Sequence, residues 1–431
     1  MEPKMRFNGF QGEWEDQTFN ETFDFLKNNS LSRDNLSTEG SVMNIHYGDI
    51  LIKFGECIDV IKDEIPYVKD ESVAKSLMKA GTLHNGDVII ADAAEDNTVG
   101  KCAELVTHDG ETVVSGLHTI AIRPKQKFAI RYLGYYMNSS AYHNQLLPHI
   151  QGTKISSISK KAVSSTHIDF PVDIPEQRAL ATFFTSLDRQ ISGAEGRLAS
   201  LKQVKAASLQ AMFPQNGETT PKLRFKGCTG EWKKVKLGEV FEHLKNNSLS
   251  RDNLATEGLV MNIHYGDVLI KYGECIDTCH DEIPYIKDAK LGKAFWNIGS
   301  LQSGDIIMAD AAEDNTVGKC SELITDNAKV VSGLHTIAIR PKQKFASCYL
   351  GYYMNSPSYH NQLLTHIQGS KISSITKKAV DSTYIHYPNE EFEQRQIAAY
   401  FTSLDRQISA QSAQITKLKQ IKAACLDQMF V

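Results

Sequence analysis

The sequence predicts a mixed α+β fold with two globular α/β domains, related by a pseudo-twofold axis and separated by two long antiparallel coiled-coil helices. Two observations predict this fold. The 431-residue chain contains one large internal repeat. In each copy, a first part with mixed helix and strand signals is followed by a long helical stretch with coiled-coil spacing. A chain of this length is too long for one hydrophobic core, so two or more domains are expected on size alone.

The repeat is nearly identical over several segments. LKNNSLSRDNL begins at Leu26 and at Leu244, and ADAAEDNTVGKC begins at Ala91 and at Ala309. VSGLHTIAIRPKQKFA also occurs twice, with one residue lost before its second copy. Solenoid repeats are about 20 to 50 residues long, so a repeat of half the chain indicates two domains instead. Pseudo-twofold packing is the natural arrangement of two such copies.

The sequence pattern of the first part of each copy is typical of a mixed α and β domain, which covers 1–175 and 221–392. Short β-branched runs beside turn residues predict strands at 88–90 and 119–122. The segment from Leu133 to Leu147 is predicted to be one helix.

The second part of each copy, 176–213 and 393–431, predicts a long helix, and 214–220 is the expected linker. Apolar residues alternate at steps of four and three, which is the spacing of a coiled-coil seam. The first helix would span about 57 Å at about 1.5 Å per residue, longer than a small domain is wide. The seam residues, which we expect to contact the other helix or a partner, are Leu187, Ile191, Leu198, Leu201, Leu404, Ile408, Ile415 and Leu418.

Bulk composition narrows the class of protein. The net charge of −4 argues against a protein that grips nucleic acid by bulk charge, but it leaves room for local basic surfaces. No run of eighteen apolar residues occurs, and the N-terminus lacks the apolar stretch of a secretory signal. We therefore expect a cytoplasmic protein.

The eight cysteines include no paired CxxC metal pattern. Cys275 and Cys279 precede His280, but Ile61 and Lys62 stand at the places that match Cys279 and His280 in the first copy. A duplicated metal site is therefore not expected, and free thiols in a reducing compartment are the better interpretation.

Catalytic motifs are also missing from the sequence. There is no GxxxxGK[ST] phosphate loop and no Asn/Asp-Pro-Pro-aromatic motif of amino-methyltransferases. We expect a recognition scaffold and no enzyme. Two equal domains held apart by rigid helices suit a ligand with two matched sites, and double-stranded DNA is the leading candidate.

Several motifs together resemble one known family over essentially the whole chain. PKMRF and PKLRF are each followed by GEW, each long helix opens near Glu-Gln-Arg, and GTKISSISKKAV or GSKISSITKKAV precedes it. This combination is similar to the specificity subunit of a type I restriction–modification system. The resemblance implies that each globular part is a target-recognition domain and that the antiparallel helices set a DNA spacer. It also implies docking of two methyltransferase subunits and of restriction subunits. Those partners would carry the chemistry with S-adenosylmethionine, ATP and Mg, and this chain would hold no cofactor.

The chain departs from the usual family pattern because its two domains are nearly identical. Identical domains related by a twofold would read the same half-site on opposite strands, so we expect a palindromic split target. The helix length sets an upper bound on the spacing of roughly 17 base pairs of about 3.4 Å each. Because the helix ends lie in the domains and each half-site takes several base pairs, the spacer should be well under about a dozen base pairs.

Three polar segments are candidate DNA contacts. In the first, asparagine can pair with adenine and arginine with guanine, although a solvated loop preserved by recent duplication is the alternative. Its residues are Lys27, Asn28, Asn29, Ser30 and Arg33, with copies Lys245, Asn246, Asn247, Ser248 and Arg251.

The second segment carries carboxylates, which can accept a hydrogen bond from cytosine N4. A metal or acid–base site and a simple capped turn are the alternatives. Its residues are Asp92, Glu95, Asn97 and Lys101, with copies Asp310, Glu313, Asn315 and Lys319.

The third segment begins with a glycine, which allows close backbone approach. By resemblance it is the most DNA-facing loop, and an ordinary turn before the helix is the alternative. Its residues are Thr153, Lys154 and Ser156, with copies Ser370, Lys371 and Ser373. By contrast, His46, Tyr47 and His118 are interpreted as packing residues.

Two other functions remain open at this stage. The chain could be a self-sufficient nuclease or methyltransferase, which activity of the purified chain alone would reveal. It could instead be a duplicated scaffold that binds two identical proteins. Salt-dependent binding to duplex DNA would separate that scaffold from a DNA-recognition subunit.

Overall fold

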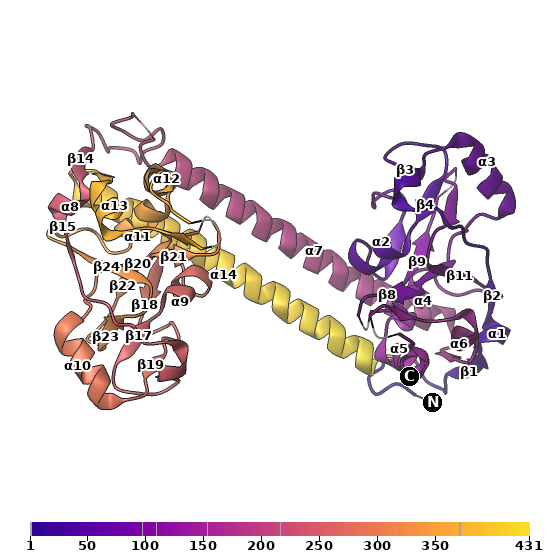
Figure 1. The fold of residues 1–431 in the computed structure, drawn as a ribbon. Helices are drawn as coiled ribbons and strands as arrows, with labels where there is room; N and C mark the ends of the chain where they lie inside the picture. The colour runs from indigo at the N-terminus through magenta and orange to yellow at the C-terminus, as the bar shows by residue number, and fades with distance from the viewer. Residues whose placement is uncertain are drawn as a thin grey trace. The chain divides into compact units, whose positions relative to one another are not determined.

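The computed structural model describes residues 2–96, 98–108, 110–152, 154–215, 217–314, 316–369 and 372–431. The chain forms two compact units: unit 1 is Met1–Glu195 with Ala413–Val431, and unit 2 is Gly196–Ser412. Each unit therefore takes residues from both long helices, α7 (Ile174–Ala211) and α14 (Glu391–Gln428), which Figure 1 draws in magenta and yellow. The mixed α+β fold with two long helices is confirmed.

The centre of unit 1 is a five-stranded sheet in the order β2-β11-β7-β9-β5. Its central strands β7 and β9 are buried along their whole length, since both faces of the sheet are covered. A four-stranded sheet, β10-β4-β6-β3, and the pairs β1-β13 and β12-β8 complete the unit. The strands are β1 (Glu15–Thr18), β2 (Phe23–Phe25), β3 (Leu36–Ser37), β4 (Met43–Ile45), β5 (Cys57–Asp59), β6 (Tyr67–Val68), β7 (Val88–Ala91), β8 (Ala93–Ala94), β9 (Cys102–Val106), β10 (Val113–Ser115), β11 (Thr119–Pro124), β12 (Ser156–Ser157) and β13 (His167–Phe170).

Unit 2 repeats this topology with the sheets β15-β24-β20-β22-β18 and β16-β19-β17-β23. The pairs β14-β26 and β21-β25 correspond to the two small pairs of unit 1. The strands are β14 (Lys233–Lys236), β15 (Phe241–His243), β16 (Leu254–Ala255), β17 (Met261–Ile263), β18 (Cys275–Asp277), β19 (Tyr285–Ile286), β20 (Ile306–Ala309), β21 (Ala311–Ala312), β22 (Cys320–Ile324), β23 (Val330–Ser332), β24 (Thr336–Pro341), β25 (Ser373–Ser374) and β26 (Tyr384–Tyr387).

Short helices cover these sheets. The predicted single helix at 133–147 is wrong, because the chain turns at Asn138 and Ser139 and forms α4 and α5 instead. The Asn138 amide donates to the Cys102 carbonyl at 2.8 Å and holds the break against β9. The helices are α1 (Phe19–Thr22), α2 (Tyr47–Ile52), α3 (Glu71–Ala80), α4 (Tyr132–Met137), α5 (Ser140–Leu146), α6 (Lys160–Ser164), α8 (Leu237–Val240), α9 (Tyr265–Ile270), α10 (Ala289–Gly299), α11 (Tyr349–Asn355), α12 (Pro357–Leu364) and α13 (Lys377–Ser382), with 3-10 turns at Arg33–Asn35, Leu147–His149 and Arg251–Asn253.

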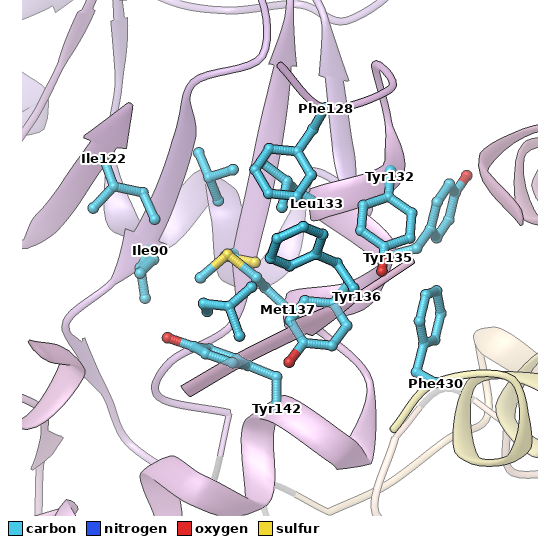
Figure 2. Packing of buried hydrophobic residues seen from close by; sticks show 14 of the residues in the cluster. Ile90, Ile122, Phe128, Tyr132, Leu133, Tyr135, Tyr136, Met137, Tyr142 and Phe430 are labelled. Atoms are coloured by element: carbon cyan, nitrogen blue, oxygen red, sulfur yellow. The ribbon is translucent and has the colours of Figure 1, made fainter. Parts of the chain in front are cut away.

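The core of unit 1 lies on both faces of the central sheet, because neighbouring strand residues point to opposite sides. Ile90 packs in an aromatic cluster with α4, while its neighbour Ile89 packs in an aliphatic cluster on the other side. Figure 2 shows Tyr132 and Tyr136 of α4 beside Phe430, which follows α14. Phe430 lies 5.6 Å from Phe184 of α7 between ring centroids, so the end of α14 belongs to the core of unit 1.

Within each unit, the parts of α7 and α14 run antiparallel. In unit 1, Lys422 bonds Asp188 at 2.6 Å and Glu56 of the domain at 2.6 Å. In unit 2, Lys205 makes the same bridge to Asp405 at 2.6 Å and to Glu274 at 2.8 Å. The seam residues Leu187, Ile191, Leu404 and Ile415 are buried, whereas Leu198, Leu201, Ile408 and Leu418 are half-buried.

Two of the recurring motifs are partners in the structure. Arg6 of PKMRF forms a two-pronged ion pair with Glu176 of Glu-Gln-Arg, at 2.7 and 2.8 Å. The neighbouring Gln177 side chain accepts from the Ala129 amide and donates to the Pro171 carbonyl. Arg224 and Glu393 repeat the ion pair in unit 2. The motifs therefore join the start of each domain to the start of its long helix.

Candidate functional site

The first predicted segment divides into exposed and structural residues. Lys27, Asn28, Ser30 and Arg33 are exposed. The Asn29 amide instead donates to Asn44 Oδ1 at 2.7 Å and to the Ser115 carbonyl at 2.9 Å. These bonds tie the segment to the end of β10. Its copies in unit 2 behave the same way: Asn247 is buried, and Lys245, Asn246, Ser248 and Arg251 are exposed.

The second segment is also divided. Glu95 is exposed, Asp92 is half-buried, and the Lys101 ammonium donates to the Leu51 carbonyl at 3.1 Å and the Phe54 carbonyl at 2.9 Å. Lys101 therefore has partners inside the fold. Glu313, Asp310 and Lys319 have the same environments in unit 2, whereas Asn97 and Asn315 lie outside the described residues.

The third segment forms a tight hairpin on the second. Ser156 and Ser157 of β12 pair with Ala94 and Ala93 of β8. Gly152 has φ +112°, and a Cβ there would lie 1.9 Å from the Ile155 carbonyl oxygen, so a glycine is needed. Lys154 is exposed on this hairpin, Ser156 and its copy Ser373 are half-buried, and Thr153, Ser370 and Lys371 lie outside the described residues.

Exposed apolar residues at this hairpin were not predicted. The Ile155 side chain is 62% exposed, and its counterpart Ile372 is 61% exposed. An apolar side chain at the tip of a polar loop could contact the methyl group of thymine. The sequence contains no signal for this exposure, because an isoleucine among serines equally suits a buried strand.

Asp92 joins the hairpin to a turn between β10 and β11. Its backbone carbonyl accepts from the Ile158 amide at 2.8 Å, and its amide donates to the His118 carbonyl at 3.1 Å. Its carboxylate lies 3.1 Å from His118 Nδ1. Burial raises the pKa of the Asp92 carboxyl, while the hydrogen bond to His118 acts in the opposite direction. Asp310 and His335 repeat the pair at 3.2 Å.

The expectation that His46, Tyr47 and His118 are packing residues holds only for part of the set. His46 is buried, and its Nδ1 accepts from the Gly48 amide at the start of α2. The His118 side chain, however, is 52% exposed, so it is no packing residue. The Tyr47 ring lies between them, 4.6 Å from the His46 ring and 5.2 Å from the His118 ring between centroids.

We call the candidate face of unit 1 the combination of 27–33, His46–Tyr47, Asp92–Glu95, Gly116–His118 and Gly152–Ser157, excluding Thr153. Its residue Arg33 joins the face to α2, because the Arg33 guanidinium lies 3.0 Å from Asp49. These segments are distant in sequence but are linked by the contacts above. The equivalent face of unit 2 has the same contacts.

Exposed positions on the face are unchanged between the copies while buried positions elsewhere have drifted. The mostly exposed run from Lys27 to Asn35 has no substitution in unit 2. Buried core positions, by contrast, exchange Phe54 for Tyr272 and Ile90 for Met308. Surface loops ordinarily vary more than cores, so this reversed pattern favours a function for the face.

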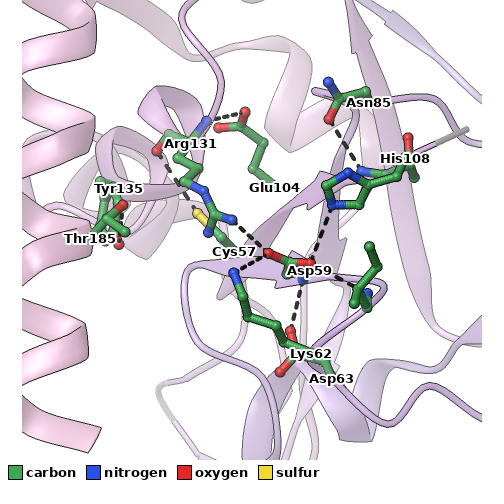
Figure 3. Close-up of polar contacts among 12 residues, drawn as sticks. Cys57, Asp59, Lys62, Asp63, Asn85, Glu104, His108, Arg131, Tyr135 and Thr185 are labelled. Carbon is green, nitrogen blue, oxygen red and sulfur yellow. Dashed lines mark hydrogen bonds and ion pairs between the residues drawn. The ribbon is translucent and has the colours of Figure 1, made fainter. Parts of the chain in front are cut away.

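A second polar cluster of unit 1 surrounds Asp59 at the end of β5 (Figure 3). Asp59 bonds Lys62 at 2.7 Å and Arg131 at 2.8 Å. Burial would raise the pKa of Asp59, but these two cations hold it below its ordinary value. The buried Glu104 accepts from the backbone amides of Arg131 and Gly134, and burial raises its pKa to about 7. Every charge in this cluster has a structural partner, which favours a role in stability.

The described part of the chain contains no group of three or more His, Cys, Asp or Glu side chains placed to hold a metal ion. The Cys279 and His280 pair is no exception, since His280 Nδ1 lies 2.9 Å from Asp277. Across the same residues, no helix has the length and apolar character needed to cross a bilayer.

Comparison with known proteins returned one family and several structures. The model for "Type I restriction modification DNA specificity domain" matches residues 12–203 and again 229–420. A comparison with curated proteins found no match.

Among solved structures, the S subunit of a type I restriction–modification system from M. genitalium is 13% identical, with a TM-score of 0.56 over 100% of this chain and 99% of that chain. A structure described for complex assembly and conformational transition of the type I R-M system is 19% identical, with a TM-score of 0.55 over 97% and 98% of the two chains. At these identities the likeness establishes the fold.

Proposed function

Because the chain belongs to the type I restriction–modification DNA specificity family, with the family model matched twice, we propose that it reads a split DNA target through two equivalent candidate faces. A specificity subunit is the non-catalytic member of such a system, and its function is DNA sequence recognition. The observation that carries the proposal is the repetition of one exposed, unchanged face in both units.

The domain ranges follow from this proposal. Residues 1–175 and 221–392 act as target-recognition domains, joined through the linker 214–220. The long helices, 176–213 and 393–431 in the sequence-based ranges, act as the spacer. Since both domains carry the same face, the two half-sites are the same sequence on opposite strands, and the target is a split palindrome.

The exposed residues of each face make the direct contacts. Lys27 and Lys154 are suited to phosphates, and Asn28 and Arg33 to base edges. Asn29 and Lys101 hold the face in shape, because their polar hydrogens already have partners in the fold. Ser30, Glu95 and the half-buried Ser156 complete the contact set, with their copies in unit 2. The half-buried Asp92 shapes the face, because its carboxylate lies 3.1 Å from His118 Nδ1.

The long helices carry the partner surfaces. Val204 of α7 is 46% exposed and Ile421 of α14 is 39% exposed, and these two residues are equivalent in the repeat. This equivalent pair of exposed apolar residues, one in each unit, supports two equivalent docking sites for methyltransferase subunits. Restriction subunits join that complex, and S-adenosylmethionine, ATP and Mg belong to the partners.

The test is to co-express the chain with its methyltransferase subunit and map methylated bases across the host genome. A split palindromic motif that disappears when this chain is omitted is the expected result. Methylation should also be lost when one base pair is added to the spacer of a reporter site. An asymmetric motif would contradict the palindrome, and methylation independent of this chain would overturn the recognition role.

A further inference from the structure

His118 has an unusual backbone for an exposed side chain. Its φ is +53°, and His335 repeats this with φ +51°. Residues other than glycine uncommonly adopt this left-handed conformation, and residues held in it cluster at functional sites. A glycine would fit the turn without strain, so the ring itself is the feature to explain.

The turn that carries His118 packs closely against β4. At Gly116, a Cβ would lie 2.6 Å from Asn44 Nδ2 and 2.6 Å from the Ile45 carbonyl oxygen. Asn44 in turn accepts a hydrogen bond from the Asn29 amide at 2.7 Å. The turn is therefore pressed onto β4, and the segment 27–33 is fixed to the same strand.

The His118 ring is held from two sides. Asp92 Oδ1 lies 3.1 Å from Nδ1, and Tyr47 meets the ring edge to face with centroids 5.2 Å apart. With Asp92 accepting from Nδ1, the remaining nitrogen Nε2 has no hydrogen-bond partner among the described residues. Holding one ring nitrogen in this way orients the other for a ligand.

We propose that His118 and His335 are specificity-determining residues, each presenting Nε2 to a base edge of its half-site. Asp92 and Tyr47, with Asp310 and Tyr265, are positioning residues that orient the rings. This inference rests on the proposed function and deepens it. It identifies the turn between β10 and β11 as the reading centre of the face of unit 1, between the exposed segment 27–33 and the hairpin that ends at β12, and the turn between β23 and β24 as that of unit 2.

The decisive variant is His118→Gly, tested in the full chain with its methyltransferase subunit. It removes the ring and relieves the backbone, so the thermal midpoint of the protein should not fall. Genome-wide methylation mapping should show a half-site that loses selectivity about tenfold or more at one position, while the other half-site is unchanged. His335→Gly should relax the opposite half, and the double variant both halves.

The matched control is Asn327→Gly. Asn327 is exposed with φ +68°, and it lies on a connection outside the candidate faces. The control makes the same backbone change and should leave the motif unchanged. Asp92→Asn tests positioning: selectivity at the same position should fall less than with His118→Gly.

Three results overturn the inference. They are an unchanged motif with His118→Gly, equal relaxation of both half-sites, and relaxation by Asn327→Gly. If His118→Gly fails to fold, His118→Asn decides, because asparagine tolerates this backbone and its side chain is shorter. A wild-type complex that methylates no split motif would instead refute the proposed function itself.

Discussion

At the scale of single residues, Gly116 shows how little room the candidate face allows. A Cβ at this position would lie 2.6 Å from the Asn44 side chain and 2.6 Å from the Ile45 carbonyl oxygen, and the second of these is backbone. Gly116→Ala must therefore displace the turn, and we expect a loss of about 1–3 kcal/mol in the free energy of unfolding. Urea denaturation measures this.

Gly55→Ala is the control for that change, because nothing lies within 4 Å of a Cβ there. It should change the unfolding free energy by no more than about 0.5 kcal/mol. Equal effects of the two substitutions would show that the turn is not tightly packed on β4.

The Arg6–Glu176 pair tests the link between the two sequence motifs. The Glu176 side chain is 3% exposed, so its charge depends on Arg6. Because Arg6→Met leaves a buried carboxylate without its partner, we expect a loss of about 3–5 kcal/mol. Urea unfolding at neutral pH provides the measurement.

Arg395→Met is the comparison for the ion pair. Arg395 bonds Glu391 on one exposed helix face at 2.8 Å, and such pairs contribute only about 0.3–0.5 kcal/mol. The double variant Arg6→Met with Glu176→Met should recover much of the lost stability, since no buried charge remains. No recovery would mean that Arg6 acts through packing alone.

At the scale of elements, the buried Glu104 links β9 to the start of α4. Its pKa is raised by burial to about 7, from an ordinary value of 4.5. The folded state therefore binds the proton more tightly than the unfolded state, and the stability of the wild type falls as pH rises from about 4.5 to 7. Glu322 makes the same contribution in unit 2, where burial also raises its pKa to about 7.

Glu104→Gln removes this proton linkage in unit 1. We expect its stability relative to the wild type to increase by about 3 kcal/mol between pH 4.5 and pH 8, on the basis of about 1.4 kcal/mol per pKa unit. Chemical denaturation of both proteins across this range measures the difference. A difference that stays constant with pH would show that folding does not raise the pKa of Glu104.

For the long helices, the sequence predicted their positions but not the packing of their ends. Their heptad spacing predicted them, and the structure places them at Ile174–Ala211 and Glu391–Gln428. The spacing did not indicate that the end of α14 enters the core of unit 1. Met5 donates to the Gln428 carbonyl at 2.9 Å, just as Leu223 donates to Ala211 within unit 2 at 2.9 Å. The contact that unit 2 makes within one continuous segment is thus made in unit 1 by the two ends of the chain.

At the scale of the whole molecule, the two docking positions that we propose on the long helices predict the stoichiometry of the complex. We expect two methyltransferase subunits per chain by native mass measurement. Val204→Asp should reduce this to one subunit, because a carboxylate replaces the exposed apolar contact in one unit only. Adding Ile421→Asp should remove both.

Gln203 and Gln420 provide the matched controls, since they are exposed neighbours of these residues on the same helices. Gln203→Asp adds the same charge and should leave two bound subunits. A one-to-one wild-type complex, or loss of both subunits with Val204→Asp alone, would contradict independent docking at each unit.

The sequence by itself determined the repeat, the two long helices and two strands of the main sheet of unit 1, β7 and β11. Each of these is encoded locally, by identity between copies, by heptad spacing or by a short run of β-branched residues. Only the tertiary structure decided which polar residues form a face. Segments such as 27–33 and 92–95 are joined in one face through pairings between strands far apart in the chain, and no local pattern records these pairings. Tertiary contacts also assigned Asn29 and Lys101 to the fold and exposed His118, because a side chain's partners depend on what the distant chain brings beside it.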